Sequence, residues 1–403
     1  MGWQPSDQLT QDVALEVLLH GPLGRAELAR RLDLAPATLT RISSELIRSG
    51  IVTETSQVIE GRGRPTTPLD VVPTAHHFLG VKLAGEFVFA VVTDLRARVV
   101  RVLDARHHTG SPEEVVDIIH SLRDEAEADH PIDAVGIAVG GVVDADGAIT
   151  SAPFLGWTDI PLAAMTERQL QRPTACANDL EAFVEALHWF GVGSGHSNFA
   201  AITLGVGVGY GCIANGRVLA NADSGVGLVG HWPLDPLGPL CRKGHQGCAE
   251  AMLTIPAIKR SMLVATGEQL DWDQIIARAR RGDDTITRLL ERSGRALGQL
   301  IAAVANLTAP DFIVIGGEGV DLAEVARADL LDGLDEHRDP RASKVSIELA
   351  PGTNEEWCRG AAVLGIRRFV LARGNANNNP LRAETPATDP TPAPEARAAA
   401  NQA

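Results

Sequence analysis

The sequence predicts an α/β protein whose main body has two lobes and follows a small helical unit. Between residues 76 and 373, strand-like runs such as FLGVKL and AVGIAVGG alternate with helix-like runs such as PEEVVDIIHSLRDEAEA. Two segments, FLGVKLAGEFVFAVVTDL and FAAITLGVGVGYGCIANGRV, each consist of a strand, a glycine turn and a second strand. This repetition indicates a duplicated domain with a cleft between its halves.

The composition indicates a cytoplasmic protein without a membrane partner. The 403 residues are too many for one ordinary core, and 45% hydrophobic with 22% charged residues is typical of a soluble globular protein. No apolar run is long enough to span a bilayer, and five irregularly spaced cysteines do not form a disulfide framework. Because the net charge is −15, any contact with DNA must come from a local basic patch.

Three parts follow from changes in composition along the chain. Residues 8–73 have helical periodicity and end in the proline-containing segment GRGRPTTPLDVVP, which we interpret as a linker. Residues 76–373 form the α/β body. Residues 374–403 are rich in Pro, Ala and Asn and have almost no large apolar side chain, so we predict a disordered tail.

The first part is predicted to be a winged helix-turn-helix that binds double-stranded DNA. RAELARRLDLAPATLTRISSELIRSG gives a helix, a turn at Asp33–Ala35 and a second helix that begins at Pro36. Apolar side chains of the second helix pack inward. The residues left on its outward face, where they would reach base edges and phosphates, are Thr38, Thr40, Arg41 and Ser43.

A wing is expected directly after these helices. IVTETSQVIE is predicted to supply both of its strands, and GRGRP follows. Arg62 and Arg64, flanked by glycines, form a cationic strip narrow enough for the minor groove. The alternative is a small helical domain whose arginines are only a solvated face. The order of helix, turn, helix, wing and GRGRP favours DNA binding.

These motifs resemble those of the ROK family, named for repressors, open reading frames and kinases. The resemblance covers residues 8 to about 370. It depends on RAELARRLDLAPATLTR and GRGRP, and on GIAVGGVVD, SAPFLGW, ANDLEA, the stretch from GHW to GCAE, and IVIGGEG. It implies that the α/β body has the actin-like, ribonuclease-H-like fold of a sugar kinase. In the kinases of the family, two glycine hairpins hold ATP and an aspartate removes a proton from a sugar hydroxyl.

The sequence departs from the kinase pattern where the phosphates of ATP would lie. The family's first hairpin, Asp-x-Gly-Gly-Thr, is KLAGE here, with Lys82, Ala84 and Glu86 replacing aspartate, glycine and threonine. A carboxylate repels phosphate oxygens, and a lysine cannot organise a divalent cation. The second hairpin has Val206 where the family has threonine. Asp179 in ANDLEA matches the catalytic base, but without bound nucleotide we predict no catalytic residue.

The family's sugar contacts are only partly retained. Leu228 stands in LVGH where the family has the glutamate of Glu-x-Gly-His, and Phe154 replaces the asparagine of Asn-Leu-Gly-Trp. The resemblance assigns five retained residues to a small-molecule effector: Gly141, Asn178, Asp179, His231 and Glu250. For Asn178 and Asp179, the alternative is that they only cap the helix LEAFVEALHWF. Lys82, beside the former phosphate site, makes an anionic effector a further hypothesis.

The family's structural zinc is held by a histidine and by Cys-x-Cys-x4-Cys. Here HWPLDPLGPLCRKGHQGCAE supplies His231, Cys241 and Cys248, with Lys243 in place of the middle cysteine. His245 lies two residues further on. Two outcomes are open: a zinc site that uses His245, or a metal-free loop in which the cysteines are small buried residues.

Together these observations predict a transcriptional repressor of carbohydrate-related genes that is not an enzyme. A sugar or sugar derivative, bound in the kinase-like domain, would change the spacing of two wings in a homodimer. Two other functions stay open. One is a regulator that uses the α/β body only for dimerisation, which thermal-shift screening with sugars would separate. The other is an active ATP-dependent sugar kinase, which an ATP-consumption assay would reveal.

Overall fold

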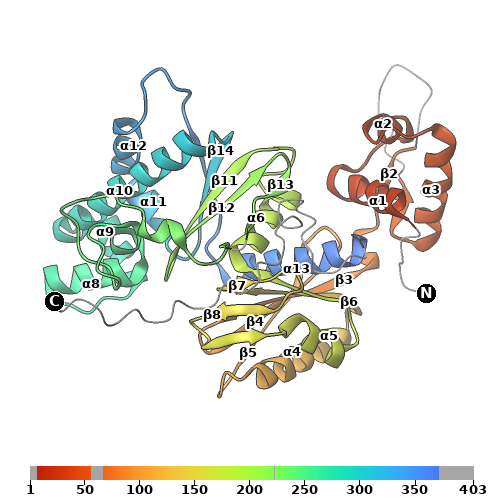
Figure 1. Ribbon diagram of the computed structural model, residues 1–403, viewed down its shortest axis with the longest axis horizontal. Coiled ribbons are helices and arrows are strands. Elements are labelled where there is room, and N and C mark those ends of the chain that lie inside the picture. Colours follow the sequence, from red (N-terminus) through yellow and green to blue (C-terminus); the bar gives the residue numbers. More distant parts are fainter. Residues whose placement is uncertain (1–6, 56–66, 222, 372–403) are drawn as a thin grey trace, which may run out of the picture.

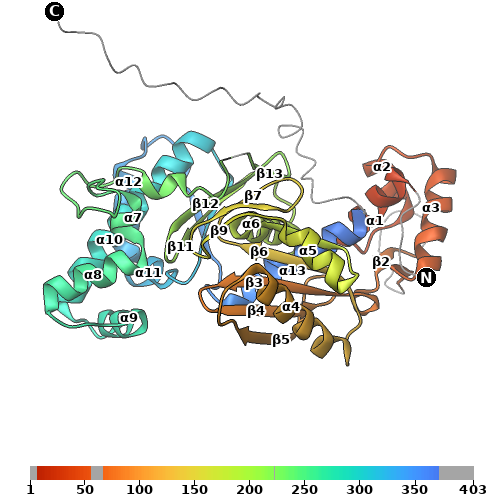
Figure 2. The same ribbon diagram turned by 60° about the horizontal axis from the view of Figure 1, so that its bottom comes forward.

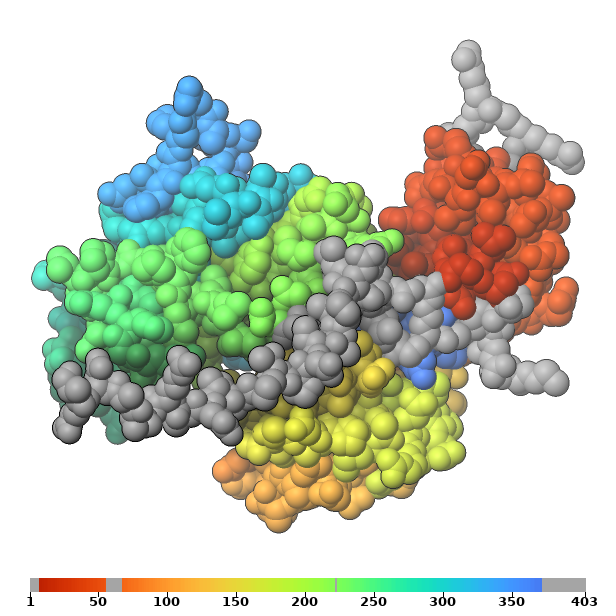
Figure 3. Space-filling model, in the orientation of Figure 1, coloured from red at the N-terminus to blue at the C-terminus, as the bar shows by residue number. Residues whose placement is uncertain are grey.

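The N-terminal unit consists of three helices and a two-stranded antiparallel sheet, and it forms a separate mass at one end of the molecule (Figures 1 and 3). The computed structural model describes residues 7–55, 67–221 and 223–371. The elements of the unit are α1 (Gln8–His20), α2 (Arg25–Arg31), α3 (Pro36–Ser49), β1 (Val52–Glu54) and β2 (Leu69–Val71). The prediction that the second helix of the motif begins at Pro36 is confirmed.

The small sheet differs from its prediction. The sequence predicts both strands within IVTETSQVIE, of which residues 56–60 lie outside the described residues. The structure pairs β1 with β2, on the far side of GRGRP. Leu69 is buried and exchanges two backbone hydrogen bonds with Leu23, with N···O distances of 2.8 and 2.9 Å. The segment interpreted as a linker therefore supplies a strand, because Leu69 and Val71 have a core to enter. Arg62 and Arg64 lie outside the described residues.

The main body contains two five-stranded sheets with the same strand order. The first has the order β10-β6-β3-β4-β5, and the second, taken in the equivalent direction, has the order β15-β14-β11-β12-β13. In each, three consecutive antiparallel strands are followed by two strands parallel to the first of them, which confirms the predicted repeat. The strands of the first sheet are β3 (His77–Ala84), β4 (Phe87–Thr93), β5 (Val99–Arg106), β6 (Ile132–Val139) and β10 (Thr174–Asn178). Those of the second are β11 (Phe199–Leu204), β12 (Val208–Ala214), β13 (Arg217–Val218), β14 (Phe312–Gly316) and β15 (Ser346–Leu349).

Helices separate and cover the two sheets (Figures 1 and 2). On the outer face of the first sheet lie α4 (Pro112–Glu127) and α5 (Leu162–Leu170). Between the sheets lie α6 (Asp179–Phe190) and α13 (Asn354–Leu371), and the outer face of the second sheet is covered by α10 (Asp284–Thr308) and α12 (Arg327–Glu336). The remaining elements are β7 (Val142–Val143), β8 (Ile149–Ala152), β9 (Trp157–Ile160), α7 (Ala249–Leu253), α8 (Ile255–Thr266), α9 (Trp272–Arg280), α11 (Asp321–Val325) and the 3-10 turns Pro73–Ala75 and Leu228–His231. In the described ranges, no helix has the length and apolar character that a membrane crossing requires.

Helix α13 lies directly on the backbone of the first sheet. A Cβ atom added to Gly136 of β6 would lie 1.8 Å from the carbonyl oxygen of Ala361, and one added to Gly80 of β3 would lie 2.0 Å from that of Cys358. The other end of α13 enters the core of the N-terminal unit, where Ile366 packs in the same cluster as Val17 of α1. This helix therefore joins the first lobe to the N-terminal unit.

The close approach of α13 makes a direct prediction about stability. We expect Gly136→Ala to lower the free energy of unfolding by about 3 kcal/mol or more, because backbone atoms cannot yield to the new methyl group as a flexible side chain would. Urea unfolding measures the change. Gly207→Ala is the matched control, since nothing lies within 4 Å of its added Cβ. Equal stabilities of the two variants would contradict this packing.

Candidate functional site

The side chain of Lys82 forms an ion pair inside the protein. Lys82 lies on β3, its side chain is only 9% exposed, and its ammonium forms an ion pair with the carboxylate of Asp179 at the start of α6. The same ammonium lies 5.1 Å from the ring centroid of Trp357 on α13. Because a buried cation needs a compensating anion, removing either partner would leave an uncompensated charge. The hypothesis that Lys82 favours an anionic effector therefore loses its basis.

A second carboxylate faces this pair from the other lobe. Glu318 follows β14, and a Cβ added to Gly205 in the β11–β12 hairpin would lie 2.3 Å from its Oε2. Burial raises the pKa of Glu318, and the nearby ammonium of Lys82 opposes that rise. Glu318 thus lies beside the second glycine hairpin, where its ionised form would repel phosphate oxygens. Glu318 was not among the predicted site residues, although a charged residue among the glycines of IVIGGEG is a detectable signal.

Asn178 holds three loops together. Its Oδ1 accepts hydrogen bonds from the backbone N–H groups of Leu180 and Glu181, at 3.0 and 3.3 Å, which confirms that it caps α6. Its Nδ2 donates to the carbonyl oxygen of Gly141 at 2.9 Å. A Cβ on Gly225 would lie 2.1 Å from that same oxygen, so only glycine fits there. Asn178 and Gly141 thus hold these loops against one another, and their predicted contact with an effector stays a prediction.

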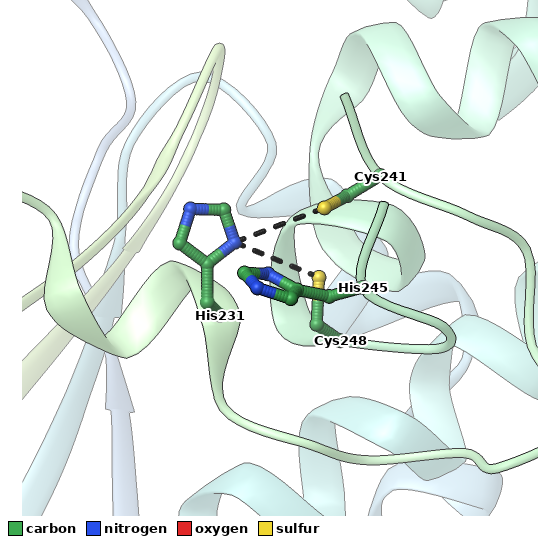
Figure 4. A group of neighbouring side chains, drawn as sticks. All are labelled: His231, Cys241, His245 and Cys248. Carbon is green, nitrogen blue, oxygen red and sulfur yellow. Dashed lines mark hydrogen bonds between the residues drawn. The ribbon is translucent and has the colours of Figure 1, made fainter. Parts of the chain in front are cut away.

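Four side chains form a compact cluster of metal-ligand type on the second lobe (Figure 4). One ligand atom from each of His231, Cys241, His245 and Cys248 lies within 4.8 Å of all the others. The Nδ1 atom of His231 is 3.9 Å from Sγ of Cys241 and 3.8 Å from Sγ of Cys248. Ligands around a tetrahedral zinc, with bonds of about 2.0–2.3 Å, lie about 3.5 Å apart, so this donor set fits zinc with a small contraction.

A tight turn brings His245 into the cluster. The backbone N–H of Cys241 donates to the carbonyl oxygen of His245 at 2.9 Å, and Gly244 between them has a φ of +85°. This turn returns the chain toward His231, so His245 takes the place that the missing cysteine would have filled. Glu250 is 3.6 Å from Nε2 of His231. A carboxylate there orients the imidazole so that Nδ1 faces the two sulfurs.

The outward face of α3 agrees only partly with its prediction. Thr40 is exposed, Thr38 is half-buried, and Arg41 is 57% exposed with long ion pairs of 3.5 Å to Asp7 and Glu45. Ser43, in contrast, is fully buried, and its hydroxyl has no hydrogen-bond partner among the described residues, so its predicted outward position is wrong.

The exposed serine of this helix is Ser44. Helical spacing from Thr40 and Arg41 places position 44 on their face and position 43 on the inward face, and this signal could have identified the correct serine.

Arg96 fastens the N-terminal unit to the first lobe. It lies in the turn between β4 and β5, and its guanidinium forms an ion pair with Asp70 of β2. The same group donates to the carbonyl oxygens of Leu18 and Gly21, at 3.4 and 3.3 Å. These carbonyl groups lie at the C-terminal end of α1. A cation is favourable there because this end of the helix dipole carries a partial negative charge. One arginine thus binds a helix end and a strand of the neighbouring unit.

The turn that carries Arg96 is itself held by several bonds. The buried carboxylate of Asp94 accepts hydrogen bonds from the backbone N–H groups of Arg96 and Arg98, at 2.8 and 2.9 Å. The N–H of Leu95 donates to the carbonyl oxygen of Pro73 at 3.0 Å, which links the turn to the chain between the two units. Leu95 is also buried in the core that the units share. The turn therefore presents Arg96 in a defined position.

The fold defines a protein with two α/β lobes of equivalent strand order and a helical unit fixed to the first lobe. Residues 78–367 match the ROK family, so the chain belongs to that family. The N-acetylglucosamine repressor of Escherichia coli O6:H1 is 28% identical over 318 residues, which are 74% of this chain and 77% of the repressor.

Two solved structures resemble this chain and cover different shares of it. A ROK family transcriptional regulator, described as a homologue of the E. coli Mlc protein, has a TM-score of 0.78 and 25% identity, and covers 91% of this chain and 97% of its own. The ROK glucokinase of Streptomyces griseus, solved with glucose and AMPPNP, has a TM-score of 0.62 and 26% identity, and covers 72% of this chain and 99% of its own.

The ion pair of Arg96 makes a prediction about local stability. We expect Arg96→Ala to raise the hydrogen-exchange rates of the last turn of α1 and of β2 by about tenfold, because a charged hydrogen-bonding group contributes on the order of 1.5–3 kcal/mol. Exchange in the first sheet would stay unchanged. Arg98→Ala, at an exposed position of the same turn, is the control and should leave all of these rates unchanged. Unaltered exchange in α1 after Arg96→Ala would show that other contacts hold the unit.

For the histidine–cysteine cluster, we propose that it holds one structural zinc ion. Purified protein is expected to contain about one zinc per chain, and a chelator should lower its melting temperature. His245→Ala should lose the metal and with it the effect of the chelator. Lys243→Ala, which changes a neighbouring residue that is not a ligand, should retain both. Wild-type protein without zinc after purification in zinc-containing medium would contradict the proposal.

Proposed function

We propose that this protein is a DNA-binding transcriptional repressor whose kinase-like domain binds a sugar or sugar derivative and transfers no phosphate. The observation that carries the proposal is the attachment of the N-terminal unit, through α13 and Arg96, to the lobe that contains Lys82 and Asp179. A kinase has no need for such an attachment. A regulator requires one, because a change at the ligand cleft must alter the part that contacts DNA.

The N-terminal unit serves as a winged helix-turn-helix. Helices α2 and α3 are the two helices of the motif, and β1 with β2 forms the base of the wing. Thr38, Thr40 and Arg41 lie on the DNA-facing side of α3. The match to a ROK transcriptional regulator supports this assignment, since it covers 91% of the chain, whereas the glucokinase match covers 72%.

The loss of phosphotransfer follows from charge. Lys82 neutralises Asp179, so the carboxylate that would take a proton from a sugar hydroxyl is already paired. The relatives support a regulatory role, because the N-acetylglucosamine repressor is similar along most of its length. Sugar hydroxyls can still contact Asp179 and Glu250, whose side chains are each about one quarter exposed.

The repressor acts as a homodimer, because two helix-turn-helix units read two half-sites about one helical turn apart. An effector that binds one arrangement of the lobes more tightly shifts the population toward it. Since α13 and Arg96 move with the first lobe, the separation of the two DNA-reading units changes with that shift. This mechanism requires no contact between effector and DNA.

The DNA-facing side of α3 can be tested with two neighbouring substitutions. We expect Arg41→Ala to weaken binding to a DNA site recovered by genome-wide mapping by about tenfold or more, since one guanidinium contact to DNA contributes on the order of 1–3 kcal/mol. Ser43→Ala should leave the affinity unchanged and the stability equal or slightly higher, because it removes a buried hydroxyl without a partner. Fluorescence anisotropy at fixed salt measures both affinities. If Arg41→Ala bound as tightly as the wild type, the assigned face would be wrong.

A further inference from the structure

Large apolar side chains are exposed on two loops whose backbones meet beside Asn178. Phe154 is 71% exposed and Leu228 is 66% exposed, and Val226 is also exposed. At both positions the resemblance to the ROK family implies a polar side chain, whereas this chain has Phe154 and Leu228. Exposed apolar side chains of this size on neighbouring loops are candidates for a binding surface.

The backbone brings the loops of these residues together at Asn178. The turn that carries Phe154 begins at Ala152, whose carbonyl oxygen accepts from the N–H of Leu155 at 3.0 Å. A Cβ on Gly141 would lie 2.9 Å from the Cα of Ala152. The Phe154 turn and the Gly141 turn are therefore in direct contact, and Gly141 is bonded to Asn178.

The loop of Leu228 reaches the same place from the other side. Gly225, three residues before Leu228, lies against Gly141, and its added Cβ would be 3.0 Å from Nδ2 of Asn178. On the neighbouring residue, Oδ2 of Asp179 would lie 3.5 Å from a Cβ added to Gly140. Two loops with exposed apolar side chains thus border a junction that also presents the Asp179 carboxylate.

The charged groups beside these loops limit which classes of ligand can bind. The ammonium of Lys82 is already paired with Asp179, and Glu318 adds a second carboxylate nearby. A phosphorylated or otherwise anionic ligand would find the Lys82 ammonium already paired and would meet repulsion from the ionised form of Glu318. A neutral ligand with hydroxyl groups for the carboxylates and an apolar part for Phe154 and Leu228 matches every group present.

We propose that the effector is a glycoside with an uncharged, apolar aglycone, such as an aryl or alkyl glycoside, and not a free or phosphorylated sugar. Phe154 and Leu228 set this specificity by contacting the aglycone, while the sugar ring lies toward Asp179. An aromatic ring on Phe154 also permits stacking with an aryl aglycone. The inference depends on the proposed function, because it names the class of ligand for the same cleft.

Calorimetry on the full-length protein tests the inference with defined probes. The probes are the phenyl β-glycosides of glucose, N-acetylglucosamine and xylose, each compared with its parent sugar. We expect at least one phenyl glycoside to bind at least tenfold more tightly than its parent, as expected for an apolar group that enters a matching apolar surface. The same glycoside should change the affinity of the protein for its DNA site.

A double variant assigns the preference to the two residues. Phe154→Asn combined with Leu228→Glu restores polar side chains at both positions, and we expect it to lose the preference for the phenyl glycoside. The control is Val264→Asn combined with Leu307→Glu, which makes matched changes at exposed apolar positions of α8 and α10 and should keep the preference. Because all four side chains are exposed, these variants are expected to fold, and thermal unfolding verifies it. Phe154→Ala, as a second variant, should lose most of the phenyl contact.

The outcomes separate this inference from the proposed function. If the parent sugars bound as tightly as the phenyl glycosides, the inference would be wrong and a sugar-responsive repressor would stand. Retention of the preference by the double variant would overturn the role of Phe154 and Leu228. If no probe bound and none changed DNA affinity, both the inference and the sugar-responsive function would be overturned.

Discussion

The contact between α13 and the first sheet is the constraint on which the other features depend. At Gly80 and Gly136 the helix and the strands meet with no side chain between them. Such packing leaves no room for independent movement, because interiors at this density transmit displacement instead of absorbing it. The helix then extends into the core of the N-terminal unit. One element therefore belongs to the first lobe and to the N-terminal unit at once.

The electrostatics of the cleft explain how a kinase architecture serves a receptor. The pairing of Lys82 with Asp179 satisfies a buried cation and a carboxylate together, and the carboxyl group of Glu318, whose pKa is raised by burial, lies nearby. Nucleotide phosphates need the opposite environment, with cations and backbone N–H groups free to receive them. The two-lobed fold is retained, while Lys82, the residue that would have to receive phosphate, is already paired with Asp179.

Sequence reasoning was most successful where a pattern is local and repeated. The duplicated hairpins, the start of α3 at Pro36 and the cap at Asn178 depend on short-range periodicity or on backbone groups that must be satisfied. It was wrong where the outcome depends on tertiary contacts. β2 forms because Leu69 finds Leu23 across the unit, and no signal within IVTETSQVIE reveals this partner.

In the candidate site, too, local patterns were predicted and tertiary contacts were not. The sequence identified His231, Cys241 and Cys248 but left His245 open, because only the turn at Gly244 shows that this ring reaches the others. Lys82 was recognised as unusual, but its partner Asp179 lies 97 residues away in the sequence. Asp179 was predicted to contact the effector instead. Ser43 is different, since strict use of the helical period would have chosen Ser44 without any structure.

Strand β4 has a consequence for the speed of the response. It runs from the hairpin at Glu86 to the turn that carries Arg96, and it is hydrogen-bonded to β3 on one side and to β5 on the other. A strand paired along both edges cannot lengthen or shorten appreciably, so its two ends shift as one rigid piece. A displacement at one end of β4 therefore reaches the other end without local unfolding or rearrangement of the core. Under the proposed function, the delay between ligand binding and the change at DNA is then set by lobe motion, which for such hinges falls in the range of roughly microseconds to milliseconds.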